Sequence, residues 1–272
     1  MFSHDNYTVF MFSMRIGTQG IPIYFKCFKG GKNCSEAFQL DVLKNGVKSV
    51  HNLFKNTDFE LIFLADRWFS STDLLDYINS LGHTYCVRLK GNINVYKDNN
   101  RMKAKKLKHR KYHSVTHKDV FITDNRYKTN IVYSDSIDTS TPWIIVTNGD
   151  TTRTIKDYSY RFGGIECVFK NQKSNGFNLE KISNMDIHSF TNMYSLVCTC
   201  VTYLTILGTD YSKNTKCYKD VSITTHKVYI IDGKRIKERV MSLFKTGMTL
   251  FHLALKSPHY IRLPLNFKLY DI

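Results

Sequence analysis

Two acidic residues stand in settings where a carboxylate could bind a divalent cation. Asp66 closes the short apolar run LIFLAD, which reads as a strand, and Glu166 lies much later in a segment with a helical pattern. In open sheets, functional groups lie at the carboxyl ends of strands. Mg²⁺ takes one or two carboxylates and leaves room for phosphate oxygens, and two such ions can hold both oxygens of a phosphodiester displacement. The pair therefore predicts metal-dependent chemistry on a phosphodiester.

Each acid also has a simpler interpretation. Asp66 could cap the helix that follows it or pair with Arg67. Glu166 could be an i,i+4 partner of Lys170 on its own helix. Taken singly, both acids fit these structural roles, so their wider setting has to decide.

The setting of Glu166 adds polar groups of the kind that contact DNA. Lys173 follows it by about two helical turns, so both side chains point to nearly one face. Tyr158 and Arg161 lie on the preceding turns. A carboxylate flanked by Tyr, Arg and Lys along one helix suits a metal site next to a DNA backbone.

The same helix carries two adjacent glycines, Gly163 and Gly164, in YSYRFGGIECVFKNQKSNG. Each costs roughly 1 kcal/mol relative to alanine inside a helix. Two explanations stay open. The pair could ease a π-bulge that absorbs one extra residue, or it could permit close packing of the helix on a sheet.

Composition favours an acidic macromolecule as partner. The chain has 272 residues, is 42% hydrophobic and carries a formal charge of +16 with a pI near 9.4. It can bury one large core or two modest ones, and its charge favours nucleic acid, although a basic bias can also serve solubility.

Seven cysteines without a CxxC motif indicate reduced thiols inside a cell and no structural zinc site. The apolar stretch SLVCTCVTYLTILG is only 14 residues long and predicts a core helix instead of a membrane span.

The order of elements predicts an α/β fold with a mixed sheet. A hairpin over 7–30 precedes a helix over 35–54, and a strand, helix, strand unit over 59–91 predicts parallel pairing with a buried first strand. Residues 97–118 are dense in Lys, Arg and His, which indicates a solvated loop or a protrusion that contacts phosphates. Hairpin and strand patterns follow up to residue 150. Helical patterns follow over 151–173, 186–208 and 234–256.

The chain resembles the insertion-sequence DDE transposases, whose catalytic domain has an RNase H-like fold related to retroviral integrases. The resemblance is carried by LADRWFSS, similar to the region of the second aspartate, and by PWIIVTN, similar to the strand before the last acid. YSYRFGGIECVFKNQKSNGFNLE is similar to the family's Tyr, Arg, Glu, Lys signature. The resemblance covers roughly residues 8–210 and implies a catalytic domain over 1–210, with a basic β-rich excursion at about 97–140, and a helical extension over 211–272.

Carried over residue by residue, the resemblance implies that Asp66 and Glu166 are catalytic and bind Mg²⁺ or Mn²⁺. It implies that Tyr158, Arg161 and Lys173 hold the transposon end. It also implies DNA as partner, both as transposon ends and as target, a possible homodimer on DNA, no membrane, and a location in the cytoplasm on the nucleoid.

The sequence departs from the family in two places. Four residues, FGGI, separate Arg161 from Glu166 where the family has three. The family's first aspartate lies on a strand ahead of the one that YTVFMFSMRIG resembles, and only MFSHDN precedes it here, so Asp5 is the one candidate for the first metal-binding acid. We therefore expect an N-terminally truncated transposase, or a remnant of one.

Three functions follow in order of support. The first is a DDE transposase that nicks DNA and transfers the strand. The alternatives are a metal-dependent nuclease without strand transfer and a non-catalytic DNA-binding remnant. A Cys or Ser hydrolase is the weakest option, because His83, His113 and His188 lie in no recognisable nucleophile motif.

Overall fold

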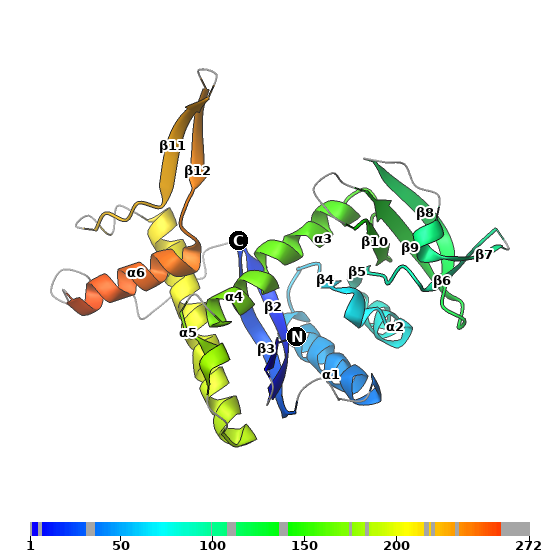
Figure 1. Ribbon diagram of the computed structural model, residues 1–272, viewed down its shortest axis with the longest axis horizontal. Helices are drawn as coiled ribbons and strands as arrows, with labels where there is room; N and C mark the ends of the chain where they lie inside the picture. Colours follow the sequence, from blue (N-terminus) through cyan, green and yellow to red (C-terminus); the bar gives the residue numbers. More distant parts are fainter. Residues whose placement is uncertain are drawn as a thin grey trace. The chain divides into compact units, whose positions relative to one another are not determined.

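A computed structural model of the chain (Figure 1) divides into two compact units. Unit 1 comprises Met1–Asn33 and Phe162–Ile272, and unit 2 comprises Cys34–Arg161. The structure describes residues 2–4, 7–30, 36–98, 100–107, 113–135, 141–173, 176–182, 185–214, 218, 221–231 and 234–256.

Unit 1 contains a three-stranded antiparallel sheet and the helices that cover it. Its strands are β1 (Phe2–His4), β2 (Tyr7–Ile16) and β3 (Gln19–Lys29), in the order β1-β2-β3. Its helices are α4 (Ile165–Lys173), the 3₁₀ turn η3 (Leu179–Lys181), α5 (Ile187–Lys213) and α6 (Leu243–Lys256), with the hairpin strands β11 (His226–Ile231) and β12 (Lys234–Arg239) between the last two. The β2–β3 hairpin forms because both strands are rich in aromatic and β-branched residues and Gly17 supplies the positive φ of the turn.

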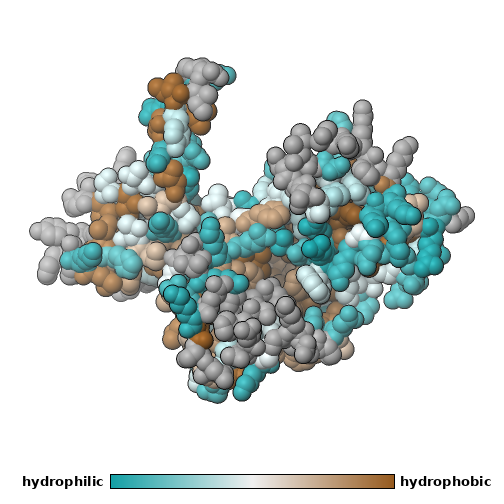
Figure 2. All heavy atoms as spheres, viewed as in Figure 1, coloured by the Kyte–Doolittle hydropathy of each residue, from teal (hydrophilic) through white to brown (hydrophobic). Residues whose placement is uncertain are grey.

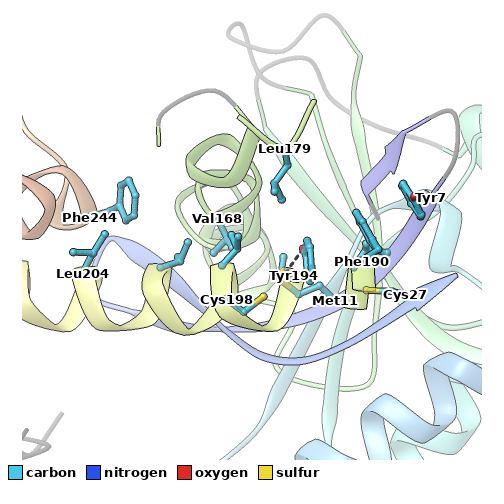
Figure 3. Packing of buried hydrophobic residues seen from close by; sticks show 13 residues of the cluster. Tyr7, Met11, Cys27, Val168, Leu179, Phe190, Tyr194, Cys198, Leu204 and Phe244 are labelled. Carbon is cyan, nitrogen blue, oxygen red and sulfur yellow. Dashed lines mark hydrogen bonds between the residues drawn. The ribbon is translucent and has the colours of Figure 1, made fainter. Parts of the chain in front are cut away.

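The core of unit 1 lies between this sheet and α5. Tyr7 from β2 stacks on Phe190 from α5 with ring centroids 3.9 Å apart, and Tyr194 donates a hydrogen bond to Gln172 of α4 at 2.8 Å. Figure 3 shows how α5 lines one side of this cluster along its length, from Phe190 to Leu204. The first half of α4 packs its apolar face on the same core.

Helix α5 begins at the N-cap Asp186, whose carboxylate accepts hydrogen bonds from the backbone N–H groups of His188 and Ser189. Among the described residues it is the one helix that is long and apolar enough to cross a membrane. Core helices can have the same composition, and ten residues of α5 are buried in unit 1. One face of α5 therefore packs in the core of unit 1, as the sequence predicted for this segment.

Unit 2 is built on a seven-stranded sheet with the order β4-β5-β10-β9-β8-β6-β7. Its strands are β4 (Ile62–Ala65), β5 (Thr84–Arg88), β6 (Asn94–Lys97), β7 (Asn100–Lys103), β8 (Ser114–Ile122), β9 (Tyr127–Ser134) and β10 (Trp143–Thr147). Its helical segments are α1 (Glu36–Phe54), η1 (Arg67–Phe69), α2 (Thr72–Ser80), η2 (Ala104–Lys106) and most of α3 (Thr154–Gly163). The pair β4–β5 is parallel and the other strand pairs of this sheet among the described residues are antiparallel, so the sheet is mixed.

The predicted α/β fold with a mixed, helix-flanked sheet is confirmed, and so is the strand, helix, strand unit β4-α2-β5. The β-rich excursion predicted at about 97–140 contains β7, β8 and β9, which belong to the same sheet, with β9 paired to β10. Two expectations were wrong. The first hairpin was expected to begin the mixed sheet, but it pairs with β1 in a sheet of its own. The strand over 59–65 was expected to be buried on both faces, but β4 is an edge strand whose residues are only partly buried.

A further correction concerns the predicted helix over 234–256. Residues Lys234–Arg239 form strand β12, and the helix begins only at Leu243. The reason is tertiary: the β-branched run of β11 offers a partner with which Lys234–Arg239 pairs residue by residue. Among the described residues after α5, the structure therefore has this hairpin ahead of helix α6.

One histidine pair in unit 2 predicts a pH dependence of stability. His83 Nε2 lies 2.9 Å from His51 Nδ1, and burial, followed by the charge of His51, lowers the pKa of His83 from its ordinary value of 6.5. A lowered folded-state pKa means that the unfolded chain binds the proton first, so stability is present above about pH 6.5 and is lost as the pH falls below it. We expect thermal melting to shift down between pH 7 and pH 5, and to shift less in His83→Gln. The exposed His113→Gln should keep the full shift, and equal shifts in all three proteins would contradict the assignment.

Candidate active site at the sheet edge and on helix α4

Asp66 lies where the parallel pair β4–β5 ends. Its Oδ1 accepts a hydrogen bond from the backbone N–H of Arg67 at 2.7 Å, so it caps the 3₁₀ turn η1. The simple interpretation as a cap is therefore confirmed in geometry. The carboxylate is nevertheless only partly buried, and one backbone N–H uses only part of the accepting capacity of its two oxygens.

Three further side chains gather at this edge, and sequence reasoning missed them. Arg88 is the last residue of β5 and donates to Thr141 Oγ1 at 2.8 Å. Trp68 is 75% exposed, and the Lys90 ammonium lies 4.7 Å from the centroid of its ring. A large exposed aromatic with a cation over its face is a surface on which a nucleic-acid base can stack. The signal was present in the sequence as a tryptophan two residues after the candidate acid.

Tyr158 lies close to Asp66 but is fully buried. Its ring packs edge-on against Trp143 with centroids 5.2 Å apart, and it joins Cys86 and Ile145 in a core cluster. Burial raises the pKa of Tyr158; the charge of Arg161 opposes this and the charge of Asp66 adds to it. In this structure Tyr158 packs as a core residue, and its assignment to DNA contact stays a prediction.

Arg161 and Asp157 complete the polar groups of α3 in unit 2. The Arg161 guanidinium carbon lies 5.7 Å from the centroid of the Tyr158 ring. Asp157 has a side chain only 10% exposed and pairs with Arg153 at 3.8 Å. Sequence reasoning passed over Asp157 because an acid in the first turn of a helix has an ordinary electrostatic role there.

The glycine pair marks the end of α3 and not a π-bulge. The helix is interrupted at Gly164, and α4 begins at Ile165. A Cβ at Gly163 would lie 3.2 Å from the carbonyl oxygen of Thr18, and a Cβ at Gly20 would lie 2.8 Å from the carbonyl group of Gly164. The close packing of the two glycines on the β2–β3 hairpin is therefore the explanation that the structure supports.

This contact predicts the effect of Gly20→Ala. The added methyl group would meet the backbone of Gly164 and Val168 Cγ2 at 3.0 Å, so β3 and α4 would have to separate. We expect a loss of about 1–3 kcal/mol in unfolding free energy, measured by urea denaturation. Thr18→Ala in the neighbouring turn is the control, because Thr18 is exposed and contributes its backbone oxygen to the contact. Equal stability of both variants would contradict the close approach.

Glu166 lies in the first turn of α4 and is exposed to solvent. A carboxylate in this position is favoured by the helix dipole. Burial raises the pKa of the neighbouring Cys167, Glu166 raises it further, and Lys170 and Arg15 lower it. The charges that act on Cys167 thus come from one carboxylate and from two bases, Lys170 of the same helix and Arg15 of the β2–β3 hairpin. Lys173 ends the same helix and is partly buried.

Asp66 and Glu166 supply the hard oxygen ligands that Mg²⁺ or Mn²⁺ prefers. Within the described parts of the chain, no group of three or more His, Cys, Asp or Glu side chains is placed to hold a metal ion. Asp5, the predicted first acid, lies outside the described residues. The chemistry of the two acids fits a divalent cation, and their roles as ligands stay predictions.

The buried cysteines do not suit nucleophilic catalysis. Burial raises the pKa of Cys27 and Cys86 to about 11 and that of Cys198 to about 12. Only the thiolate is a good nucleophile, and at neutral pH these thiols stay protonated. His83, which could have served as a base, pairs with His51. A cysteine hydrolase therefore finds no support among these residues.

A mixed sheet flanked by helices, with one acid at the end of a sheet strand and a second acid on a helix later in the chain, is the arrangement of the RNase H-like class. The family model for the transposase DDE domain matches residues 16–203, well over half of the chain. The chain therefore belongs to the DDE transposase family, and the match contains Asp66, Glu166 and the whole Tyr, Arg, Glu, Lys signature. No curated protein matches the sequence.

Proposed function

We propose that this transposase cuts DNA at the ends of a mobile element and joins the freed 3′-hydroxyl to target DNA, with Asp66 and Glu166 as the metal-binding acids. The single observation that carries this proposal is the family match that spans both acids in order. The position of Asp66 at the carboxyl end of a parallel strand supports it, since ligand groups lie there in open sheets.

The roles of the side chains follow from their chemistry. Asp66 and Glu166 would hold Mg²⁺ or Mn²⁺, which when bound stabilises the negative charge that develops on the phosphate. Arg161 and Lys173 would bind phosphates and fix the DNA end, because guanidinium and ammonium groups position a backbone without reading its sequence. Asp5 is proposed as the first acid of the site. The reaction proceeds by direct displacement, so no nucleophilic side chain is required.

Two alternatives differ from this proposal by their products. A nuclease would cut and not join, and a DNA-binding remnant would do neither. The test incubates the full chain with supercoiled plasmid and a labelled duplex in the presence of Mn²⁺. Nicked plasmid together with labelled duplex joined to it supports a transposase, and nicking without joining supports the nuclease. If the chain binds DNA in a salt-dependent manner but none of its preparations cleaves DNA, the result supports the DNA-binding remnant.

The formal charge of +16 supports DNA as partner, because such a charge lowers the free energy of binding to polyanions. Both the transposon ends and the target would be duplex DNA, held by two copies of the chain. We place this activity in the cytoplasm on nucleoid DNA. Sedimentation of the chain with and without an end-containing duplex tests the homodimer.

A further inference from the structure

The hairpin of β11 and β12 forms a two-stranded antiparallel ribbon outside the part of the chain that the family model matches. Within unit 1 it stands out from the ends of α5 and α6 (Figure 1). Nearly all its described side chains are exposed, including large apolar ones such as Ile230, which is 78% exposed. Figure 2 shows hydrophobic and hydrophilic side chains interleaved along this ribbon. An exposed ribbon of this kind contributes little to a core, so its side chains are available to a partner.

The register of the ribbon sorts its charges onto two unlike faces. Because directly paired residues share a face and side chains alternate along a strand, one face carries His226, Val228, Ile230, Arg235, Lys237 and Arg239. This set, the cationic face, contains three bases and no acid. The opposite face carries Lys227, Tyr229, Lys234, Ile236 and Glu238. On that face Lys227 and Glu238 are direct cross-strand partners, so part of its positive charge is neutralised.

Two observations describe the base of the cationic face, where His226 and Arg239 are paired. Arg239 donates to the carbonyl of Met241 at 2.8 Å and to Ser212 Oγ of α5 at 3.0 Å, which anchors the base of the ribbon. The pKa of His226 is lowered by desolvation and further by the charges of Lys237 and Arg239. Lys237 and Arg239 therefore lie near enough to His226 to act on it electrostatically.

We propose that the ribbon is a DNA-binding arm, with its cationic face turned to duplex DNA and Arg235 and Lys237 on the phosphates. A two-stranded ribbon has the width that the major groove admits. Exposed aliphatic side chains lie between the arginine and lysine side chains of this face. They suit contact with the edges of nucleobases, such as the methyl group of thymine. This inference rests on the proposed function for the choice of DNA over other polyanions.

The test compares two charge-matched double variants of the full chain. Arg235→Gln with Lys237→Gln removes two charges from the cationic face, and Lys227→Gln with Lys234→Gln removes two from the opposite face. Binding to a labelled DNA duplex is measured over a series of salt concentrations. We expect the first variant to bind at least about tenfold more weakly at low salt, with the slope of log K against log salt smaller by about 2. The second variant should stay close to wild type in both quantities.

Equal losses in both variants would overturn the inference, since they would reflect net charge alone. Unchanged binding in both, with wild type still cutting plasmid DNA, would overturn the arm and leave the proposed function standing. Absence of duplex binding by wild type would overturn both. A change in sedimentation mass of the first variant without a change in DNA affinity would assign the ribbon to a contact with a second copy, and would overturn the inference as well.

Discussion

Replacing either acid, Asp66→Asn or Glu166→Gln, should lower Mn²⁺-dependent plasmid nicking by about a thousandfold or more. A bound metal contributes several kcal/mol to stabilising the charge of the transition state, and about 4 kcal/mol corresponds to a factor of a thousand. DNA affinity should change little. Both replacements are expected to fold, because an asparagine oxygen can still accept the Arg67 N–H and the side chain of Glu166 is exposed.

Matched controls exist for both acids. Asp73 lies in the first turn of α2 and Glu36 in the first turn of α1, and both are exposed. Asp73→Asn and Glu36→Gln should therefore nick at the wild-type rate. If they lose as much activity as the first pair, or if Asp66→Asn stays active, the assignment of the site is wrong. Asp5→Ala is the companion variant: loss of activity would identify it as the first acid, and retained activity would leave a site with two acids.

The second large effect is expected at the crossing of α5 and α6. A Cβ at Gly208 would overlap the carbonyl oxygen of Leu243 and lie 2.8 Å from the amide nitrogen of Gly247. A Cβ at Gly247 would overlap the carbonyl oxygen of Leu204 in the same way. The two helix backbones are thus in direct contact. Because the atoms that an added Cβ would meet belong to the backbone, the clash cannot be relieved by a change of side-chain conformation. Gly208→Ala and Gly247→Ala should each cost about 3 kcal/mol or more in stability.

The loss should appear as a fall in melting temperature of about 6–12 °C, measured by circular dichroism. Undocking of α6 also removes buried apolar side chains, among them Phe244, from the core of unit 1. Thr199→Ala on the exposed face of α5 is the control, since it creates the same residue in the same helix without a clash. A Gly208→Ala protein that melts like this control would show that the helices do not cross so closely.

Local patterns in the sequence predicted most helices and strands, and the order of the candidate site residues along the chain. The period-2 and period-3.6 patterns found the β2–β3 hairpin, α1, the β4-α2-β5 unit and α5, because these segments bury one face each and burial imposes the spacing. Asp66 could be placed at a strand end for the same reason. A capping role for Asp66 could also be proposed from the sequence, because an N-cap is a contact between close neighbours, although the capped element is the short turn η1 ahead of α2.

The errors arose where distant segments compete for a partner. Lys234–Arg239 has helix-forming residues, yet it pairs with β11, and the Asp-Gly dipeptide between them was an unused hairpin signal. The burial of Tyr158 likewise depends on distant partners, because Trp143 and Cys86 pack around it, while its assignment to DNA contact stays a prediction. Whether a segment pairs as a strand or a side chain is buried depends on the residues that pack against it. Those residues lie far away in the chain, so the local sequence does not identify them.

The sequence by itself determined the kinds of chemistry available: two acids in the order and setting of the DDE family, bases along the signature helix and a strongly positive chain. Only the tertiary structure decided which surfaces those groups occupy. It brought Trp68, Arg88 and Lys90 to the edge beside Asp66, and it sorted the bases of the β11–β12 ribbon onto one face. The physical reason is that strand register and packing contacts are set by partners far away in the chain, whereas residue type and local period are not.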